Sequence, residues 1–525
     1  MRGYGSLKES DDLELLYRIL TKISHLKPRG TVSELIANQS PSSEIEMYQL
    51  QQFLLQHFSS SDFKKQVLAH IGSGKSSYCY AMPKEMLSIL SDEGIAVAGI
   101  RSLFLWYLFC IKSWVKGIAY ALLVIAKSLS GKMKLLSIGG SRGQQENSYI
   151  ILPGIPGNAV PDSDLQDCRC LISWFVDNYL RKKKAAGQLP LSEVQEIRHN
   201  VTSKPNLSYG NFTVRAMEGV LPVPLTSAAI GKFLVLVLYV SVKALIYLLA
   251  GRWQAALQMV EIVKSLQASV LVANQLPVAV FFNNSCRIYK PLWAYTLEKR
   301  GTQVSFYFYS TNNELLDGKL NYGWDIVTWG HYLVWDQYQV DFLSKYSPIP
   351  VTTEVVGPVY LEDTASACPD FMEDVIAVFD VQPVRFSFYA QLGMNSEYYV
   401  PAVTNSFLTD ISRQASSCGM KVVLKRKRDI GKMLHPKYRN LIDELSRSGV
   451  VREVDAGLSP YKILEKAKGV ICMPFTSVAH YASELGVPAI YYDPTALLNP
   501  DRRDLSHGIP ILNNDTDLLH WMADL

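Results

Sequence analysis

The sequence lacks a cysteine pattern, a marked charge of either sign and an apolar export segment. Its 8 cysteines are scattered, with no C-x-x-C pair, which argues against a zinc site or a disulfide framework. The 52 basic and 48 acidic side chains leave a net charge of +4, a bias too small to indicate nucleic acid. The first twelve residues are polar, so we expect a cytosolic protein with reduced thiols.

Length and composition predict more than one folded domain. Of the 525 residues, 48% are hydrophobic and 19% are charged, which is typical of a globular chain rather than a disordered one. Domains usually hold about 100–200 residues. We therefore expect two large domains and an N-terminal extension.

Two apolar segments, residues 103–127 and 233–250, leave three interpretations open. Each is interrupted by lysine, namely Lys112 and Lys116 in the first and Lys243 in the second. A charge near the bilayer centre is costly, so a spanning helix competes with an interfacial helix and a buried core helix. Basic edges favour the interface, as do aromatic side chains suited to the headgroup level. These are Trp106, Tyr107, Trp114 and Trp253.

Short apolar runs alternate with helical segments from residue 148 onward, which predicts βαβ units and parallel sheets. In the first half, strands are expected at residues 148–152, 278–282, 304–309, 326–329, 332–335 and 352–360, with helices at 285–300 and 337–346. In the second half, strands are expected at 375–379, 421–424, 450–454, 469–472 and 488–492.

The predicted fold class is α/β, in three parts. Residues 1–147 form a helical region with a hydrophobic segment, residues 148–361 an α/β domain with a hydrophobic helical insertion, and residues 362–525 a doubly wound α/β domain.

The segment Pro474-Phe475-Thr476-Ser477, called here the PFTS segment, lies between a buried strand and a helix. Thr476 or Ser477 is expected to cap that helix, where backbone N–H groups and hydroxyls favour a phosphate. Glu484 lies two turns further on, followed by Gly486 and Pro488. Simple capping by the hydroxyls and a solvent-facing Glu484 are the alternative.

A second candidate site is formed by His435 and Pro436, which open the next helix after a strand and the basic run that begins at Lys425. Proline fits the first helical turn, so His435 is expected just before a helix N-terminus. An imidazole there is able to bind a phosphate or protonate a departing phosphate oxygen. A basic run is usually a solvated face, and this applies to Lys425 and its neighbours taken alone.

The segment Gly72-Ser73-Gly74-Lys75-Ser76 does not form a phosphate-binding P-loop. That motif needs a glycine five residues before Gly74, and Ala69 stands there.

Together with Phe379-Asp380-Val381-Gln382-Pro383, the PFTS segment and the His435-Pro436 pair resemble the bacterial polysaccharide biosynthesis PFTS motif family. They are more distantly similar to bacterial sialyltransferases and Kdo transferases, which are GT-B enzymes that use CMP-activated sugars. The resemblance runs from about residue 277 to the C-terminus. It implies two Rossmann-like domains that face a cleft. It also implies that His435, Pro436, Thr476 and Ser477 hold the phosphate of a nucleotide sugar, with Lys425, Pro474 and Glu484 as further donor-site candidates.

The first α/β half would then carry the acceptor side. Residues after its strand ends are candidates for sugar recognition, namely Asn283, Ser285, Arg287, Trp293, Thr311 and Asn312. A carboxylate base is also needed, and the candidates are Asp162, Asp164, Asp336 and Asp380. Asp336, Asp380 and His435 form the predicted catalytic set. Asp-x-Asp tripeptides occur at residues 162–164 and 515–517, but neither is taken as a metal-binding motif, so neither a metal nor another cofactor is expected.

These features predict a glycosyltransferase of capsule, O-antigen or lipopolysaccharide assembly at the inner face of the plasma membrane. Its partners would be a nucleotide sugar, with a CMP-linked nonulosonic acid or Kdo as the favoured donor, and a glycan or lipid-linked glycan acceptor. Two alternatives stay open. One is a nucleotide-sugar epimerase or CDP-polyol phosphotransferase, and the other is a non-catalytic membrane-associated assembly protein.

Overall fold

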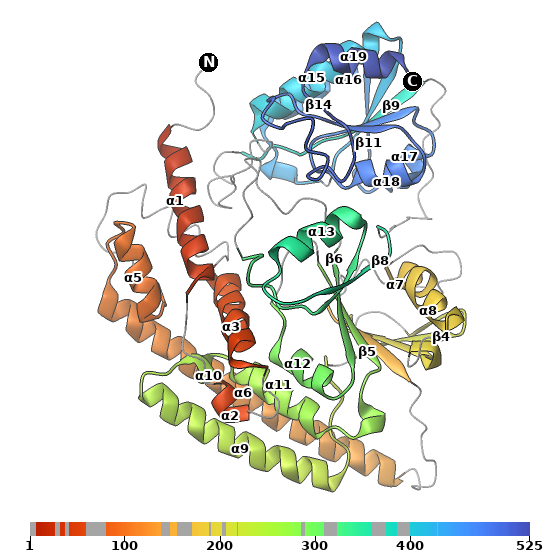
Figure 1. Ribbon diagram of the computed structural model, residues 1–525. Coiled ribbons are helices and arrows are strands. Elements are labelled where there is room, and N and C mark those ends of the chain that lie inside the picture. The colour runs from red at the N-terminus through yellow and green to blue at the C-terminus, as the bar shows by residue number, and fades with distance from the viewer. Residues whose placement is uncertain are drawn as a thin grey trace.

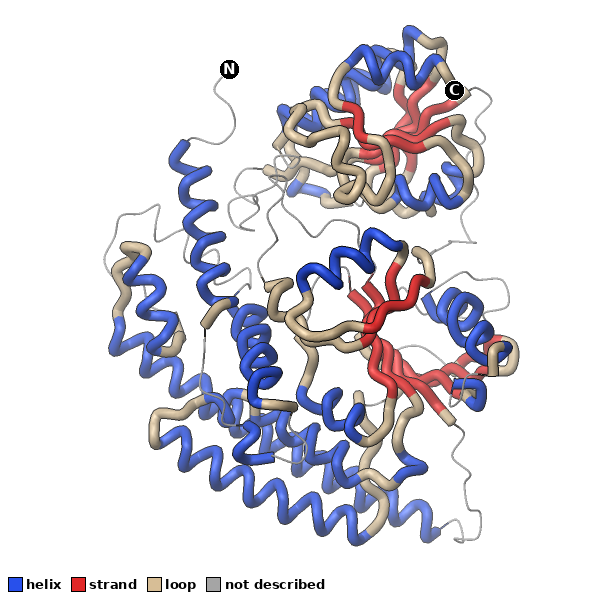
Figure 2. Tube along the Cα trace, viewed as in Figure 1, coloured by secondary structure: helices blue, strands red, loops and turns tan. Residues whose placement is uncertain are grey.

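The computed structural model describes residues 7–26, 32–36, 41–58, 80–137, 148–154, 171–187, 191–201, 206–217, 219–284, 289–308, 323–358, 374–385, 400–427 and 429–525. Within these ranges the chain forms two α/β domains and a layer of helices (Figure 1). In Figure 2 the two sheets are separate, one above the other, and the described segments at the lower left of the molecule are helices joined by loops. The expected α/β class with two doubly wound domains is confirmed by the strand orders given below.

The first sheet has eight strands in the order β3-β4-β2-β1-β5-β6-β7-β8. Only the β3–β4 pair is antiparallel. The strands are β1 (Tyr149–Leu152), β2 (Glu196–His199), β3 (Leu207–Tyr209), β4 (Phe212–Ala216), β5 (Ala279–Asn284), β6 (Gln303–Phe308), β7 (His331–Val334) and β8 (Thr352–Val355). All four residues of β1 are buried, as expected of a parallel strand covered on both faces.

Short helices cover this sheet. They are α7 (Leu171–Phe175), which continues through a π-helical turn (Val176–Leu180) into α8 (Arg181–Ala185), then α12 (Leu292–Lys299) and α13 (Gln337–Tyr346). Short 3-10 turns lie at Leu191–Glu193 and Ala273–Gln275.

The second sheet has six strands in the order β11-β10-β9-β12-β13-β14. Its strands are β9 (Val375–Phe379), β10 (Lys421–Lys425), β11 (Val451–Val454), β12 (Gly469–Cys472), β13 (Ala489–Tyr492) and β14 (Ile511–Leu512). Its helices are α15 (Pro401–Ser417), a 3-10 turn (Gly431–Met433), α16 (Pro436–Arg447), α17 (Pro460–Leu464), α18 (Val478–Glu484) and α19 (Asp515–Ala523). The strand order reverses between β9 and β12, and ligands of doubly wound sheets bind at the carboxyl side of such a switch point.

The remaining helices form a layer below and beside the first sheet (Figure 1). They are α1 (Leu7–Ser24), α2 (Val32–Ile36), α3 (Ser43–Phe58), α5 (Lys84–Asp92), α6 (Gly99–Ser137), α9 (Ser227–Leu249), α10 (Gln254–Leu257) and α11 (Met259–Val270). Gly117 of α6 lets α11 approach closely, because a Cβ there would lie 2.4 Å from Cγ of Met259. Two of the helices, α6 and α9, are long and apolar enough to cross a membrane by length and composition.

The structure corrects two predicted elements. Residues 326–329 form turn and loop instead of a strand, and their Trp329 packs in the core against Phe282 and Phe306. A short apolar run is buried here without strand geometry. The helix expected from residue 285 begins at Leu292, while residues 285–288 lie outside the described part of the chain.

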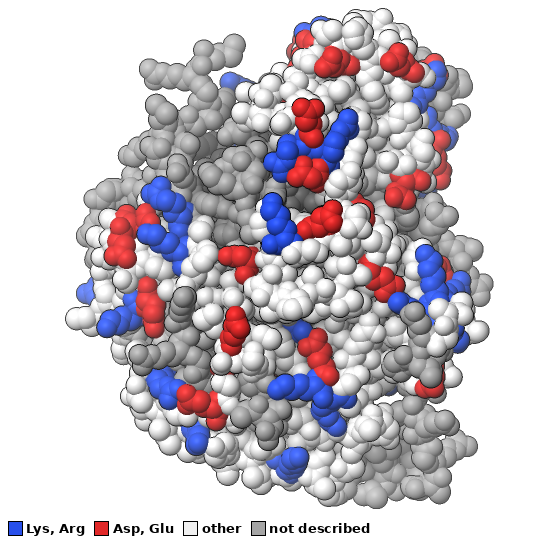
Figure 3. Space-filling model, viewed as in Figure 1, with Lys and Arg blue, Asp and Glu red and all other residues white. Residues whose placement is uncertain are grey.

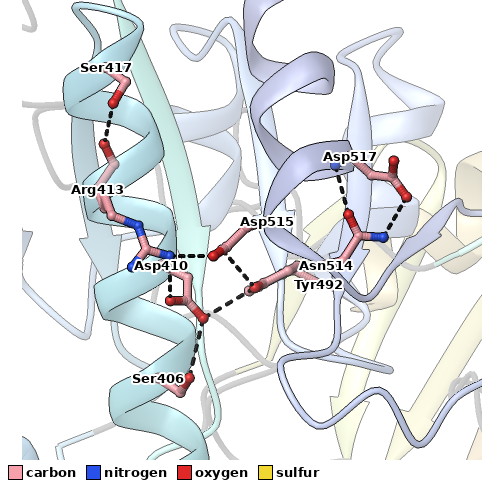
Figure 4. A network of polar contacts seen from close by, with 8 residues as sticks. All are labelled: Ser406, Asp410, Arg413, Ser417, Tyr492, Asn514, Asp515 and Asp517. Carbon is pink, nitrogen blue, oxygen red and sulfur yellow. Dashed lines mark hydrogen bonds and ion pairs between the residues drawn. The ribbon is translucent and has the colours of Figure 1, made fainter.

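A polar network holds α19 against α15 and β13 (Figure 4). Asp410 accepts hydrogen bonds from Ser406 at 3.2 Å, Arg413 at 3.0 Å and the Tyr492 hydroxyl at 3.1 Å. Arg413 also pairs with Asp515 of α19 at 2.5 Å. Asp410 therefore joins α15 to β13, while Arg413 and Tyr492 make the contacts with Asp515 of α19.

We predict that Asp410→Ala lowers the free energy of unfolding by about 1–2 kcal/mol, since the half-buried Tyr492 hydroxyl loses an acceptor. Arg413→Ala, which removes a side chain that is 52% exposed, is expected to cost about 0.5 kcal/mol. Urea denaturation of both variants measures the difference. Equal losses would show that Asp410 does not organise the network.

Candidate functional site

Three sequence segments converge at the carboxyl ends of β9 and β12. The Met473 amide, next to the PFTS segment, donates to the Phe379 carbonyl at 2.9 Å. On the other side of β9, Val384 forms an isolated antiparallel bridge with Leu434. The His435 amide donates to the Pro383 carbonyl at 3.0 Å. The motifs singled out in the sequence are thus joined by main-chain hydrogen bonds at the switch point of the sheet.

Asp380 lies beneath these main-chain contacts and links β9 to α16. Its side chain is fully buried and accepts a hydrogen bond from the hydroxyl of Tyr438, on the first turn of α16. Burial raises the pKa of Asp380 to about 6, although the Tyr438 hydrogen bond and the charge of Arg426 oppose the shift. Because Tyr438 lies three residues after His435, this bond holds the start of α16 at the sheet edge. Asp380 is therefore placed to position His435, and its carboxyl group lies beneath the surface.

His435 is the N-cap residue of α16, with Pro436 in the first helical turn. Its Nδ1 accepts a hydrogen bond from the Lys437 amide at 3.2 Å. Partial burial lowers the pKa of His435, and the charges of Lys437 and Arg385 lower it further. The sequence reasoning missed Arg385. The sequence signal for Arg385 is its positive charge two residues after Pro383, which ends the segment Phe379-Asp380-Val381-Gln382-Pro383.

The PFTS segment forms a tight turn. Phe475 has φ of 57°, a left-handed conformation that is costly for a bulky residue and is concentrated at functional sites. Tyr491 supports the turn, since its ring contacts Phe475 at a centroid distance of 5.7 Å and its hydroxyl donates to the Thr476 carbonyl at 3.0 Å. The turn is therefore built by the next strand, β13.

The expected side-chain capping of α18 is not observed. Ser477 occupies the N-cap position, but its side chain makes no capping hydrogen bond. Within the described part of the chain, the Thr476 and Ser477 hydroxyls are half-buried and make no hydrogen bond. Both hydroxyls are available to a ligand.

The two α/β domains meet where β7 ends. Asp336 caps α13 by accepting from the Gln339 amide at 3.0 Å, and its other oxygen lies 2.8 Å from Nδ1 of His507 in the second domain. Burial raises the pKa of Asp336, but the hydrogen bond and charge of His507 outweigh it, so the net pKa is lowered. His507 has φ of 52°, a second left-handed residue. The sequence identified Asp336 but not its partner, which lies 171 residues away.

His480 of α18 extends this contact. Its ring centroid lies 5.2 Å from that of His507 and 5.7 Å from that of Trp335. Its Nε2 is buried without a hydrogen-bond partner in the described residues. The helix that follows the PFTS segment thus packs directly on the carboxyl end of β7.

Two predicted ligand residues have other roles. Lys425 is buried, and its Nζ donates to the carbonyls of Arg426 at 3.3 Å and Ala456 at 3.1 Å. It therefore closes a loop instead of facing a phosphate. Trp293 is 3% exposed and its ring packs against Phe282 beneath α12. Trp293 is therefore a core residue, and its indole ring is not accessible for stacking on a sugar.

The other predicted residues are placed less decisively. Pro474 is buried in the turn, Asn283 is half-buried in β5 and Glu484 is exposed at the last residue of α18. The remaining candidates lie outside the described residues. These are Asp162, Asp164, Ser285, Arg287, Thr311 and Asn312.

A cavity of about 520 Å³ opens at the carboxyl ends of β10 and β11. Its charged lining comprises Arg426, Lys427, Asp429, Glu453 and Asp455. Arg426 pairs with Glu453 and its charge reaches Asp380, so the cavity adjoins the switch point. Its volume lies in the range of small-molecule sites.

We predict that His480 makes the protein sensitive to acid. Burial lowers the pKa of His480 to about 3, with a further lowering by the charge of His507. The unfolded chain binds a proton near pH 6.5 and the folded chain does not. The contribution to stability is therefore complete above pH 6.5 and is lost as the pH falls towards 3.

At pH 5 the expected loss is about 2 kcal/mol, from about 1.36 kcal/mol per pKa unit. His480→Phe keeps an aromatic ring at this position but removes the titratable group. It should reduce the loss of unfolding free energy between pH 7.5 and pH 5, as measured by urea titrations. His520→Phe on the exposed face of α19 is the matched control. The same pH dependence in wild type and His480→Phe would refute the assignment.

No curated protein matches the sequence. Among solved structures, the chain is similar to the wall teichoic acid polymerase TagF, with 10% identity, a TM-score of 0.33, and coverage of 78% of this chain and 88% of that one. It is also similar to a glycosyltransferase from Rickettsia africae, with 12% identity, a TM-score of 0.32, and coverage of 72% and 87%.

A third similar structure is UGT71G1 of Medicago truncatula with UDP-glucose, at 9% identity and a TM-score of 0.31, with coverage of 73% and 94%. The fold class rests on the strand order described above and not on these distant structures. The family model described as polysaccharide biosynthesis PFTS motif protein matches residues 240–522, which is more than half of the chain. The match begins upstream of the residue at which the resemblance was expected to start. The chain belongs to the polysaccharide biosynthesis PFTS motif protein family.

Proposed function

We propose that this protein is a glycosyltransferase of bacterial surface-polysaccharide assembly, which transfers a sugar from a nucleotide donor to a glycan or lipid-linked glycan. One observation carries the proposal. The family's PFTS segment and the His435-Pro436 pair are joined at the switch point of a doubly wound sheet, and the helix after the PFTS segment contacts Trp335 and His507 at the domain interface.

The donor phosphate is assigned to the space between α16 and the PFTS turn. His435 lies at the N-terminus of a 12-residue helix, where the helix dipole favours an anion. The charges of Lys437 and Arg385 already act on His435. The hydroxyls of Thr476 and Ser477 donate from the neighbouring strand end. The adjoining cavity receives the nucleoside, and its carboxylates accept hydrogen bonds from sugar hydroxyls.

The acceptor is activated by the pair of Asp336 and His507. Asp336 stays ionised at neutral pH because its pKa is lowered. Its hydrogen bond to Nδ1 orients the imidazole and stabilises the imidazolium that forms when His507 takes the proton of the acceptor hydroxyl. Because this pair joins the domains, the base is assembled only when they are in contact.

Three finer features complete the proposal. The favoured donor is a CMP-linked nonulosonic acid or Kdo, after the resemblance to sialyltransferases and Kdo transferases. After the same resemblance to GT-B enzymes, transfer is proposed to proceed without a bound metal or other cofactor. The place of action is the inner face of the plasma membrane.

The donor site predicts that His435→Ala and Ser477→Ala each weaken nucleotide binding by about tenfold or more, because each removes a hydrogen bond to a charged phosphate, worth about 1.5–3 kcal/mol. Calorimetric titration with CMP, UDP, GDP and CDP measures the affinity and identifies the base. His520→Ala and Ser483→Ala, on exposed positions of α19 and α18, are the controls. If no nucleotide or nucleotide sugar binds, or His435→Ala leaves binding unchanged, the proposal fails.

The base pair predicts a separate effect on turnover. His507→Asn and Asp336→Asn are expected to lower kcat by about 10²–10⁴-fold, the range for loss of a general base, with little change in nucleotide affinity. Asp341→Asn on the exposed face of the same helix, α13, is the control. A loss of nucleotide binding equal to the loss of turnover would instead place the pair in the donor site.

A further inference from the structure

The helices α6 and α9 pack side by side at the lower edge of the molecule and leave a broad apolar surface uncovered (Figure 1). The exposed large apolar side chains of α6 are Ile100, Phe104, Leu105, Leu108, Ile111, Val115, Leu122, Leu123 and Leu129, and those of α9 are Leu234, Val235, Leu238, Tyr239, Val242, Ile246 and Leu249. A contiguous apolar face of this kind marks an interaction surface. We call it the α6–α9 face.

Neither helix is a core helix. Only 22% of the most apolar window of α6 and 33% of that of α9 is buried. Val235 is 66% exposed and Leu238 is 65% exposed, while Phe233 and Val237 on the same helix are buried. Each helix therefore buries one stripe against the protein and presents the rest of its apolar surface outward.

The geometry also argues against a spanning helix. The buried stripe of α6 runs from Ser102 to Ser128, which is about 39 Å at 1.5 Å per residue and exceeds the bilayer core of about 30 Å. Along this stripe α6 is tied to the same body. Trp114 donates to the Ser241 carbonyl of α9 at 3.0 Å, and Tyr120 donates to Gln267 of α11 at 2.9 Å.

The end of α6 nearest its N-terminus is fixed to the first α/β domain as well. Trp106 contacts Trp253 at a centroid distance of 5.1 Å and belongs to the apolar cluster that includes Ile326. Gln52 of α3, in the same helical layer, donates to the Ile326 carbonyl. A bilayer crossing would separate parts of the chain that are packed together.

Charge identifies what covers the face. Together α6 and α9 carry eight Lys and Arg and no Asp or Glu, whereas the whole chain is nearly balanced, with 52 basic and 48 acidic side chains. In Figure 3 the lower edge of this side of the molecule is mostly uncharged, with a few scattered basic side chains and an acidic one among them at the lower left. Glu34 of α2, which pairs with Arg252 and accepts from Tyr247, is an acid at the end of α9. Apolar helices that themselves carry basic and no acidic side chains are the pattern of a helix that lies in an anionic membrane surface.

We propose that the α6–α9 face is a monotopic membrane anchor, in which both helices lie within one leaflet of an anionic bilayer. The apolar side chains enter the acyl region, and Lys112, Lys116 and Lys232, all exposed, reach the headgroups. The inference concerns how the protein meets the membrane and does not depend on the proposed transfer chemistry. Its failure would leave the donor and base experiments unaffected.

Flotation of the full chain with sealed vesicles tests the anchor. The protein is expected to float with vesicles of phosphatidylcholine and phosphatidylglycerol, and less with phosphatidylcholine alone or in high salt. The double variant Val235→Glu and Leu238→Glu should partition at least about tenfold less, because two buried apolar side chains are replaced by charges. Leu497→Glu in the second domain, where the native side chain is also 56% exposed, should float as wild type.

Circular dichroism checks that the double variant is folded, which is expected because both native side chains are exposed. If the wild-type protein floats with neither kind of vesicle, the proposal is overturned. The proposal is also overturned if the wild-type protein forms a dimer in the absence of lipid and the double variant is a monomer, because a second copy of the chain would then cover the face. Trypsin sealed inside the vesicles should leave the bound chain intact, and cleavage would show that a helix spans the bilayer.

Discussion

The pairing of β9 with β12 is the constraint on which the rest of the second domain depends. β9 lies in the middle of the sheet, with Cys472 of β12 opposite Phe379, and all residues of both strands are buried. Parallel strands bring their carboxyl ends to one edge. Segments that leave β9 and β12 in opposite directions along the sheet therefore begin side by side, although Asp380 and Pro474 are far apart in the sequence. The switch point exists because of this pairing.

A buried carboxyl group then converts strand pairing into site geometry. Asp380 has no exposure to solvent, and its bond to Tyr438 sets the first turn of α16. Breaking such a bond would leave a buried polar group without compensation, which is costly in a low-dielectric interior. The same logic applies at the domain interface, where Asp336 and His507 are each half of a contact that neither domain completes alone. Asp380 thus holds the start of α16 in place within the second domain, and Asp336 holds His507 in place between the two domains.

The helical layer fixes an orientation of the two α/β domains. α11 lies between the apolar helices and the first sheet and contacts α6, α9 and α12. The α6–α9 face and the second domain therefore lie at opposite ends of the molecule in Figure 1. A membrane bound at α6 and α9 would lie far from the switch point of the second sheet, so the proposed nucleotide donor would reach its site from solution.

The sequence by itself determined the α/β class, the strands that bear the motifs and the motif residues, because buried parallel strands are continuous apolar runs and turns have distinctive residues. The helix at Gln337–Tyr346 and the strand at Val375–Phe379 have the predicted bounds. Short, mixed strands such as β2 and β4 carry no such signal, and the buried run at residues 326–329 carries a misleading one. Only the tertiary structure decided what each polar side chain contacts. In the structure Lys425 points inward and Trp293 lies in the core, Asp336 contacts His507, and the α6–α9 face is exposed. Such contacts form between segments that are far apart in the sequence, and no local sequence pattern specifies which distant segments meet.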